Sequence, residues 1–191
     1  MYRIAIDPSL SKFAIIVFES KTNKIVDNLL VRSGYSKAKQ QWPWIEYFDT
    51  PQGKVNYVAD TAFNFIEPYL SECDQIIIEG LSFASIGNAT RDLAGVFHSF
   101  LHRLYLINFS KYTIYAPMTL TKHAKTQIKG DLPKDKKKIA INLAMELYPD
   151  FIDQFVVSAN SKRTGKEDYA DAVCANVTYC EKELGGFKLD T

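Results

Sequence analysis

The sequence predicts an α/β protein in which a mixed β-sheet is covered by helices on its faces. Three short β-rich runs come first, at residues 2–7, 13–20 and 24–32, and helical and strand-like segments then alternate. An antiparallel meander that leads into such alternation is typical of a mixed sheet packed between helices. We expect five strands in this sheet.

The first half of the chain supplies the meander, one helix and one further strand. Turn-like residues separate the three β-rich runs, as expected for consecutive antiparallel strands. Residues 34–56 show no clean period and contain both tryptophans, so we interpret them as an inserted segment. A helical stripe of apolar residues begins at Tyr57, and the apolar run "QIIIEG" at residues 75–80 predicts a strand.

The second half of the chain predicts three helices and one strand. Asn88 can cap the first of these helices, whose apolar residues follow the 3.6-residue period. Residues 112–117 ("YTIYAP") predict a short strand that Pro117 ends. Asp131 is the expected cap of the next helix, and the last helix is expected to start near Asp168.

The composition is that of one globular domain over residues 1–191. The chain is 47% hydrophobic and 24% charged, and it is long enough to bury a core. No apolar run reaches the roughly 20 residues that cross a bilayer, and the start lacks the pattern of a signal peptide. Three cysteines without CxxC spacing argue against a disulfide framework. We therefore expect a cytoplasmic protein without a membrane partner.

The net charge of +1 hides a basic segment beside an acidic one. Residues 111–138 contain eight lysines and two aspartates, a local charge of +6, whereas residues 146–191 contain nine acids and five bases. A lysine-rich run is usually a solvated surface. It also suits contacts with the phosphates of a nucleic acid, so charge alone leaves both interpretations open.

Four acidic residues lie where the backbone pattern changes, each beside residues that must be buried. Asp7 ends the first strand, and Glu79 ends the strand at residues 75–80. Asp168 and Asp171 lie three residues apart at the start of the last helix, and therefore on one side of it. Because groups at strand ends lie on the rim of a sheet, where ligands bind, we expect the four carboxylates to converge.

Converging carboxylates raise one another's pKa unless a cation offsets their charge. Oxygen ligands favour Mg²⁺, with Mn²⁺ as a substitute, over zinc. Two such ions about 4 Å apart activate a water and stabilise the leaving oxygen in phosphodiester cleavage. The pattern therefore predicts a site with two metal ions.

Each acid also has a purely structural interpretation. Asp7 before Pro8 suits a turn, and Glu79 can simply mark the exit from a strand. Asp168 followed by Asp171 resembles a helix cap with an acid in the first turn. Taken together, the structural interpretation needs several coincidences, which favours a site.

Four stretches of the chain resemble RuvC-type Holliday-junction resolvases, of the bacterial and bacteriophage branch, which have a ribonuclease H-like fold. They are "IDPSLSKFAIIVFE", "IIIEG", "YAPMTLTK" and "DYADAV", in this order, and the resemblance spans residues 2–180. It implies that the catalytic, metal-binding acids are Asp7, Glu79, Asp168 and Asp171.

The same resemblance implies a set of basic and aromatic residues. Lys122 resembles the lysine near the scissile phosphate. A second active-site lysine falls best on Lys136, with Lys134 and Lys137 as rivals. Phe83 resembles the aromatic residue that inserts near the crossover. The expected DNA-binding residues are Phe83, Arg91, Lys122, Lys125, Lys129, Lys134, Lys136 and Lys137.

The implied function is a homodimeric, Mg²⁺-dependent endodeoxyribonuclease that resolves four-way DNA junctions, in recombination, repair or phage DNA processing. Symmetric hydrolysis would leave 5′-phosphate ends, and residues 89–108 would form the dimer helix. Two features depart from the family: Ser9 stands where many relatives have glycine, and residues 34–56 have no recognised counterpart.

Other functions stay open at this point. One is a ribonuclease H-like nuclease for other branched DNA, and another is a junction-binding protein with weak catalysis. A proofreading exonuclease would carry a second acid where Ser9 stands, and a hybrid-cutting ribonuclease H usually draws its glutamate from a helix, unlike Glu79. A phosphotransferase of the actin and sugar-kinase fold would need glycine-rich phosphate loops. The chain has only nine glycines, which argues against this fold.

Overall fold

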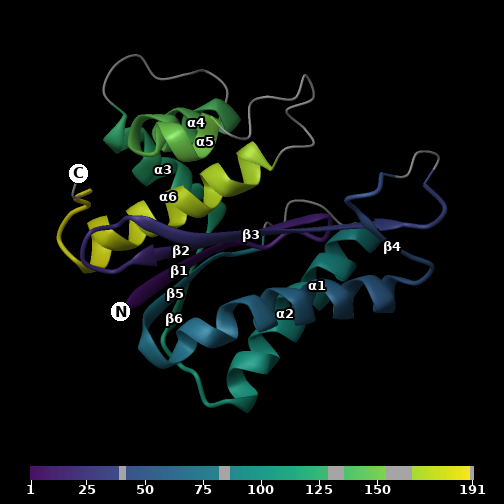
Figure 1. Cartoon of the computed structure of the whole chain (residues 1–191). Coiled ribbons are helices and arrows are strands. Elements are labelled where there is room, and N and C mark those ends of the chain that lie inside the picture. The colour runs from purple at the N-terminus through teal and green to yellow at the C-terminus, as the bar shows by residue number, and fades with distance from the viewer. Residues whose placement is uncertain (39–41, 82–86, 129–135, 154–164, 190–191) are drawn as a thin grey trace.

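A six-stranded mixed sheet forms the middle layer of the protein, with helices on both faces (Figure 1). The computed structural model describes residues 1–38, 42–81, 87–128, 136–153 and 165–189. The strand order is β4-β3-β2-β1-β5-β6. Within the described ranges, no helix is long and apolar enough to cross a membrane.

The sheet begins as the expected meander and continues with parallel strands. Its strands are β1 (Tyr2–Asp7), β2 (Lys12–Glu19), β3 (Ile25–Tyr35), β4 (Glu46–Phe48), β5 (Cys73–Glu79) and β6 (Tyr112–Tyr115). β1 pairs antiparallel with β2 and parallel with β5, so it lies near the centre of the sheet. Burial on both faces explains why β1 and β2 read as apolar runs.

The expectation of five strands is wrong by one strand. β4 lies inside the segment 34–56 and pairs in parallel with the end of β3. Its three residues are too few to show a strand period in the sequence. The rest of the segment is partly shared with its neighbours, since β3 runs to Tyr35 and the first helix starts at Pro51 instead of Tyr57. Thr50 caps that helix by accepting a hydrogen bond from the Gly53 amide.

Two helices cover one face of the sheet, and the others cover the opposite face (Figure 1). The helices are α1 (Pro51–Ile66), α2 (Asn88–Leu106), α3 (Pro117–Gln127), α4 (Lys136–Leu147), α5 (Pro149–Asp153) and α6 (Lys166–Glu183), with a 3₁₀ turn at Glu67–Glu72. Side chains of β1 alternate between the two layers: Ile4 and Ile6 pack with α1 and α2, and Ala5 packs with α6.

Several helix boundaries differ from the sequence expectation. The sequence analysis did not predict α3. Pro117 starts this helix, because a proline in the first turn loses no hydrogen bond. Gly87, not Asn88, is the N-cap residue of α2. Asp131, the expected cap of the next helix, lies outside the described residues, and the described part of α4 begins at Lys136. The five-residue α5 was also not expected.

The start of α6 places Asp168 inside the helix and not at its cap. Gly165 is the N-cap residue, with a left-handed φ of 78°, and no side chain caps this end. A Cβ at Gly165 would overlap the Leu30 side chain, so both the backbone and the packing require glycine. The interpretation of Asp168 as a helix cap is therefore wrong.

Candidate active site

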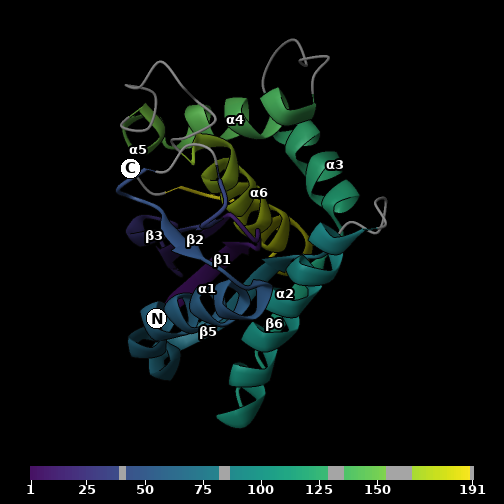
Figure 2. The same ribbon diagram turned by 90° about the vertical axis from the view of Figure 1, so that its right-hand side faces the viewer.

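The four sequence-predicted acids meet at one end of the sheet. Asp7 ends β1 and Glu79 ends β5, and because these strands are parallel neighbours, both residues lie at the same edge. Asp168 and Asp171 belong to the first two turns of α6, which packs on β1. Figure 2 turns this end of the sheet toward the viewer.

The electrostatics of Asp7 show that the four carboxylates interact. Burial raises the pKa of Asp7 well above its usual value, and the charges of Glu79, Asp171 and Asp168 raise it further. Burial also raises the pKa of Glu79, to about 7. Like charges at the end of a buried strand are costly for folding, so this arrangement calls for positive charge from elsewhere.

Lys12 supplies part of that positive charge. It is the first residue of β2, and its Nζ lies 3.1 Å from Asp168 Oδ2. The ammonium opposes the rise in the pKa of Asp7. Reasoning from sequence did not select Lys12, although it lies inside the first family-like stretch. A lysine after a turn carries no local signal of its partner, which lies 156 residues away on α6.

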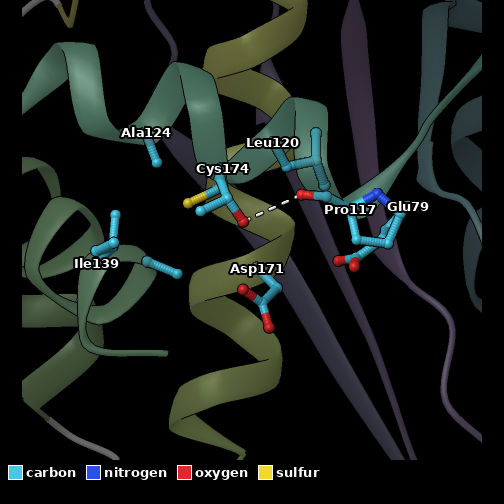
Figure 3. A pocket seen from close by; sticks show the side chains of 9 residues that line it. Glu79, Pro117, Leu120, Ala124, Ile139, Asp171 and Cys174 are labelled. Carbon is cyan, nitrogen blue, oxygen red and sulfur yellow. Dashed lines mark hydrogen bonds between the residues drawn. The ribbon is translucent and has the colours of Figure 1, made fainter. Parts of the chain in front are cut away.

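Glu79 and Asp171 line a pocket of about 170 Å³ between α3, α4 and α6 (Figure 3). Cys174 also lines this pocket, and burial raises the pKa of its thiol, with Asp171 and Glu79 adding to the rise. The thiol is therefore held in its protonated form. The Thr121 hydroxyl on the α3 wall donates a hydrogen bond of 3.1 Å to the Pro117 carbonyl (Figure 3).

Comparisons with known proteins find similarity in structure only. A scan of the sequence against protein-family models finds no match, and neither does a search of the curated proteins. A solved structure of RuvC from Thermus thermophilus matches with a TM-score of 0.61 at 12% identity, covering 98% of this chain and 99% of that one. A second T. thermophilus RuvC, solved in complex with a Holliday junction substrate, matches with a TM-score of 0.58 at 9% identity and 96% coverage of both chains.

The chain shares the fold of these two RuvC structures. At these identities the likeness concerns the fold, and it confirms the expected α/β, ribonuclease H-like class. It extends over nearly the full length of the chain, including the elements that carry Asp7, Glu79, Asp168 and Asp171.

The basic residues expected from the RuvC resemblance are only partly described. Lys122 and Lys125 are exposed on α3, whose Leu120 and Ala124 face the pocket. Lys136 and Lys137 lie in the first turn of α4, where the structure does not describe their side chains. Phe83, Lys129 and Lys134 lie outside the described residues. The placement of Lys122 and Lys136 near a scissile phosphate stays a prediction.

Arg91 lies at the start of α2 and is engaged within the protein. Its guanidinium pairs with Asp92 at 3.0 Å, and the Tyr35 hydroxyl donates a hydrogen bond of 3.0 Å to the other oxygen of Asp92. Arg91 is nevertheless 68% exposed, so a ligand can reach it. Its role in DNA binding stays a prediction.

The acids of this RuvC fold suit a hard cation by their chemistry, without forming a closed cage. Among the described residues, no group of three or more His, Cys, Asp or Glu side chains has the geometry to hold a metal ion. Mg²⁺ needs less than that, because one or two carboxylates with waters and substrate phosphates complete its shell. Glu79 and Asp171, which share one pocket, offer such a pair, and both interact electrostatically with the buried Asp7, whose pKa is raised first by its burial.

Proposed function

We propose that this protein is a metal-dependent endonuclease that resolves four-way DNA junctions as a homodimer. The observation that carries the proposal is the meeting of four interacting carboxylates at one sheet edge of a RuvC fold. A similar fold in complex with a Holliday junction substrate supports branched DNA as the substrate. Hydrolysis at two symmetric sites would leave 5′-phosphate ends and suit a role in recombination, repair or phage DNA processing.

Mg²⁺ or Mn²⁺ would be held by the four acids, two ions per site. When bound, such ions lower the pKa of a water and offset the charge of the reacting phosphate. The carboxylates by themselves repel DNA, so they exclude a phosphate from this edge until positive charge is present. Lys12 contributes one such charge through its 3.1 Å ion pair with Asp168. The four acids are Asp7, Glu79, Asp168 and Asp171.

Lysines on the rim would position the DNA backbone. α3, which lines the acidic pocket, buries Leu120 against the core and leaves Lys122 and Lys125 exposed. Contacts of this kind bind phosphates without reading the base sequence, as expected for an enzyme that recognises the shape of DNA. Lys136, at the start of α4, would be the second lysine near the scissile phosphate.

A dimer is supported by apolar side chains that the single chain leaves exposed. Tyr105, Leu106 and Ile107 at the end of α2 are 73%, 63% and 46% exposed, and Tyr112 and Ile114 on β6 are 38% and 42% exposed. Three consecutive exposed apolar residues at the end of α2 suit a protein–protein contact surface. We therefore propose that the dimer contact lies at α2. Sedimentation of the free protein would measure whether it is a dimer.

The test is cleavage of a labelled four-way junction, with linear duplex and an RNA–DNA hybrid alongside, in Mg²⁺ and in EDTA. We expect paired nicks in the junction only when Mg²⁺ is present. The variant Asp7→Asn should lower the rate by about a hundredfold or more, close to 2.7 kcal/mol, while junction binding persists. Asp150→Asn, a matched change at an exposed acid on α5, should leave the rate unchanged.

The same assay separates the remaining functions. Cleavage of flaps or forks in preference to four-way junctions would favour a nuclease for other branched DNA. Junction binding without cleavage in Mg²⁺ or Mn²⁺ would identify a binding protein. Full activity of Asp7→Asn would contradict the assignment of the acids.

A further inference from the structure

A second pocket, of about 190 Å³, shares a residue with the acidic site. It lies between the start of β2, the end of β3 and the segment that leads into β4. Lys12 and Arg32 line it, together with the indoles of Trp42 and Trp44, and we call it the tryptophan pocket. Because the Lys12 ammonium also pairs with Asp168, the tryptophan pocket directly adjoins the acidic residues.

The two indoles form an open aromatic platform. The Trp42 and Trp44 rings stack with centroids 5.0 Å apart and an interplanar angle of 27°. Trp44 is 48% exposed, and neither indole belongs to the two hydrophobic cores that cover the faces of the sheet. Packing in the core therefore does not account for these rings, and one of them has a surface available to a ligand.

Local contacts hold the platform in place before any ligand arrives. The Trp42 amide donates a hydrogen bond of 2.8 Å to the Tyr47 hydroxyl, and the Ile45 amide donates one of 3.1 Å to the Trp42 carbonyl. The Tyr47 ring lies against Gly34 of β3, where a Cβ would come within 2.7 Å of the ring. Glycine at this position therefore allows Tyr47 to anchor the segment, and a pre-ordered aromatic surface binds at a lower entropic cost.

The chemistry of the tryptophan pocket matches a nucleotide. Bases stack on exposed aromatic rings whatever their sequence, and nearby lysine and arginine attract the phosphate. In continuous duplex DNA the bases stack on one another and are not available for such a contact. A strand that leaves one duplex arm for another, as at a branch point, can offer an unpaired base.

We propose that the tryptophan pocket binds one unpaired nucleotide of the DNA strand next to the cleaved phosphate. Its base stacks on Trp44, and its phosphate faces Lys12 and Arg32. This assignment rests on the proposed junction-cleaving function and deepens it, because the pocket adds a reason to prefer branched DNA over duplex. It also gives the segment 34–56, which has no recognised counterpart in the family, a role in substrate choice.

The experiment uses the natural fluorescence of the protein. The chain contains only two tryptophans, Trp42 and Trp44, so its indole emission reports on this pocket alone. The full-length Asp7→Asn variant in Mg²⁺ is titrated with a four-way junction, with duplex of the same sequence and with oligothymidine. Binding of each DNA is measured in parallel by the anisotropy of a label on the DNA. We expect the junction and oligothymidine to quench the emission, and duplex to leave it nearly unchanged.

Variants then test the stacking contact. Trp44→Ala should weaken junction binding about tenfold, as expected for loss of one base stack, and Trp44→Phe should keep most of the affinity. Leu184→Ala removes an exposed apolar side chain after α6 and should leave junction binding unchanged. If Trp44→Ala fails to fold, two measurements still test the stacking contact. One is the quenching of indole emission when the Asp7→Asn protein binds the junction, and the other is the junction affinity of Trp44→Phe.

Three results would overturn the inference. The first is saturated junction binding with no change in indole emission. The second is equal quenching by duplex and junction, which would remove the link to an unpaired base. The third is an emission that changes with protein concentration and not with DNA, which would mean that a second copy of the chain covers the pocket. The proposed function is tested separately, because junction cleavage by the unmodified protein does not depend on the indole signal.

Discussion

Two polar clusters lie at opposite ends of the same two elements, β1 and α6. Near the start of β1, Arg3 meets Asn176 from the later turns of α6. At the end of β1, Asp7 interacts with Asp168 and Asp171 from the first turns of α6. Arg3 and Asp7 are four residues apart on one strand and therefore point to the same side of the sheet.

The arginine cluster is satisfied in its hydrogen bonds. Arg3 is 3% exposed, and its Nε donates to Asn176 Oδ1 at 3.1 Å, while Nη1 donates to the Ser20 carbonyl at 2.6 Å. Its Nη2 donates to the Asn23 side chain, which in turn donates to the Lys188 carbonyl at 2.6 Å. A buried guanidinium with this many oxygen partners stabilises the fold and does not need a ligand to complete its hydrogen bonds.

The acidic cluster has the opposite character. The charges of Glu79, Asp171 and Asp168 each raise the pKa of Asp7, and the Lys12 ammonium, paired with Asp168, opposes that rise. Strain of this kind costs stability, and proteins retain it mainly where a ligand relieves it. Burial alone therefore does not mark a functional polar residue, whereas burial among carboxylates of the same charge does.

Truncating Arg3 gives the largest expected change in stability. Arg3→Ala should lower the free energy of unfolding by about 3 kcal/mol, because several buried oxygen acceptors lose their donor. Urea denaturation measures the loss. Lys21→Ala, at an exposed lysine nearby, serves as the matched control and should change stability by less than about 0.5 kcal/mol. If Arg3→Ala lowered the free energy of unfolding by less than about 0.5 kcal/mol, the arginine cluster would not be structural.

The pH dependence of the metal-free protein tests the acidic cluster. The folded pKa of Glu79, about 7, lies above its usual value of 4.5, so the folded state binds the proton more tightly than the unfolded state. The free energy of unfolding should therefore fall as the pH rises from 4.5 to 7, by on the order of 2 kcal/mol. Glu79→Gln should flatten this part of the profile in EDTA. An equal slope in both proteins would contradict the raised pKa.

Neutralising Asp7 gives the smallest expected change in stability. The free energy of unfolding should rise, whereas truncating Arg3 should lower it. Asp7→Asn removes one of the repelling charges, so it should raise the free energy of unfolding in EDTA by about 1 kcal/mol. Thermal unfolding of the two proteins measures the gain, and added Mg²⁺ should narrow it by stabilising the unmodified protein more. Destabilisation by Asp7→Asn would mean that the aspartate has a structural role like that of Arg3.

Much of this arrangement could be predicted from the sequence. The central strands show as short apolar runs and the long helices as 3.6-residue periods, and the four acids stand at the boundaries of these segments. β4 and α5 were missed because three and five residues carry too little pattern. α3 was missed because Pro117 suits the end of a strand as well as the start of a helix.

The sequence by itself determined which residues can lie at a rim, since strand ends and helix starts are local properties of the chain. Only the tertiary structure decided which of them meet. The parallel pairing of β1 with β5 brings Asp7 to the edge that holds Glu79, and the packing of α6 on β1 adds Asp168. The tertiary structure also turns Lys12 toward that edge and sets Trp42 and Trp44 beside Lys12. Such contacts join residues far apart in the chain, and their energy depends on burial and distance, which no local pattern encodes.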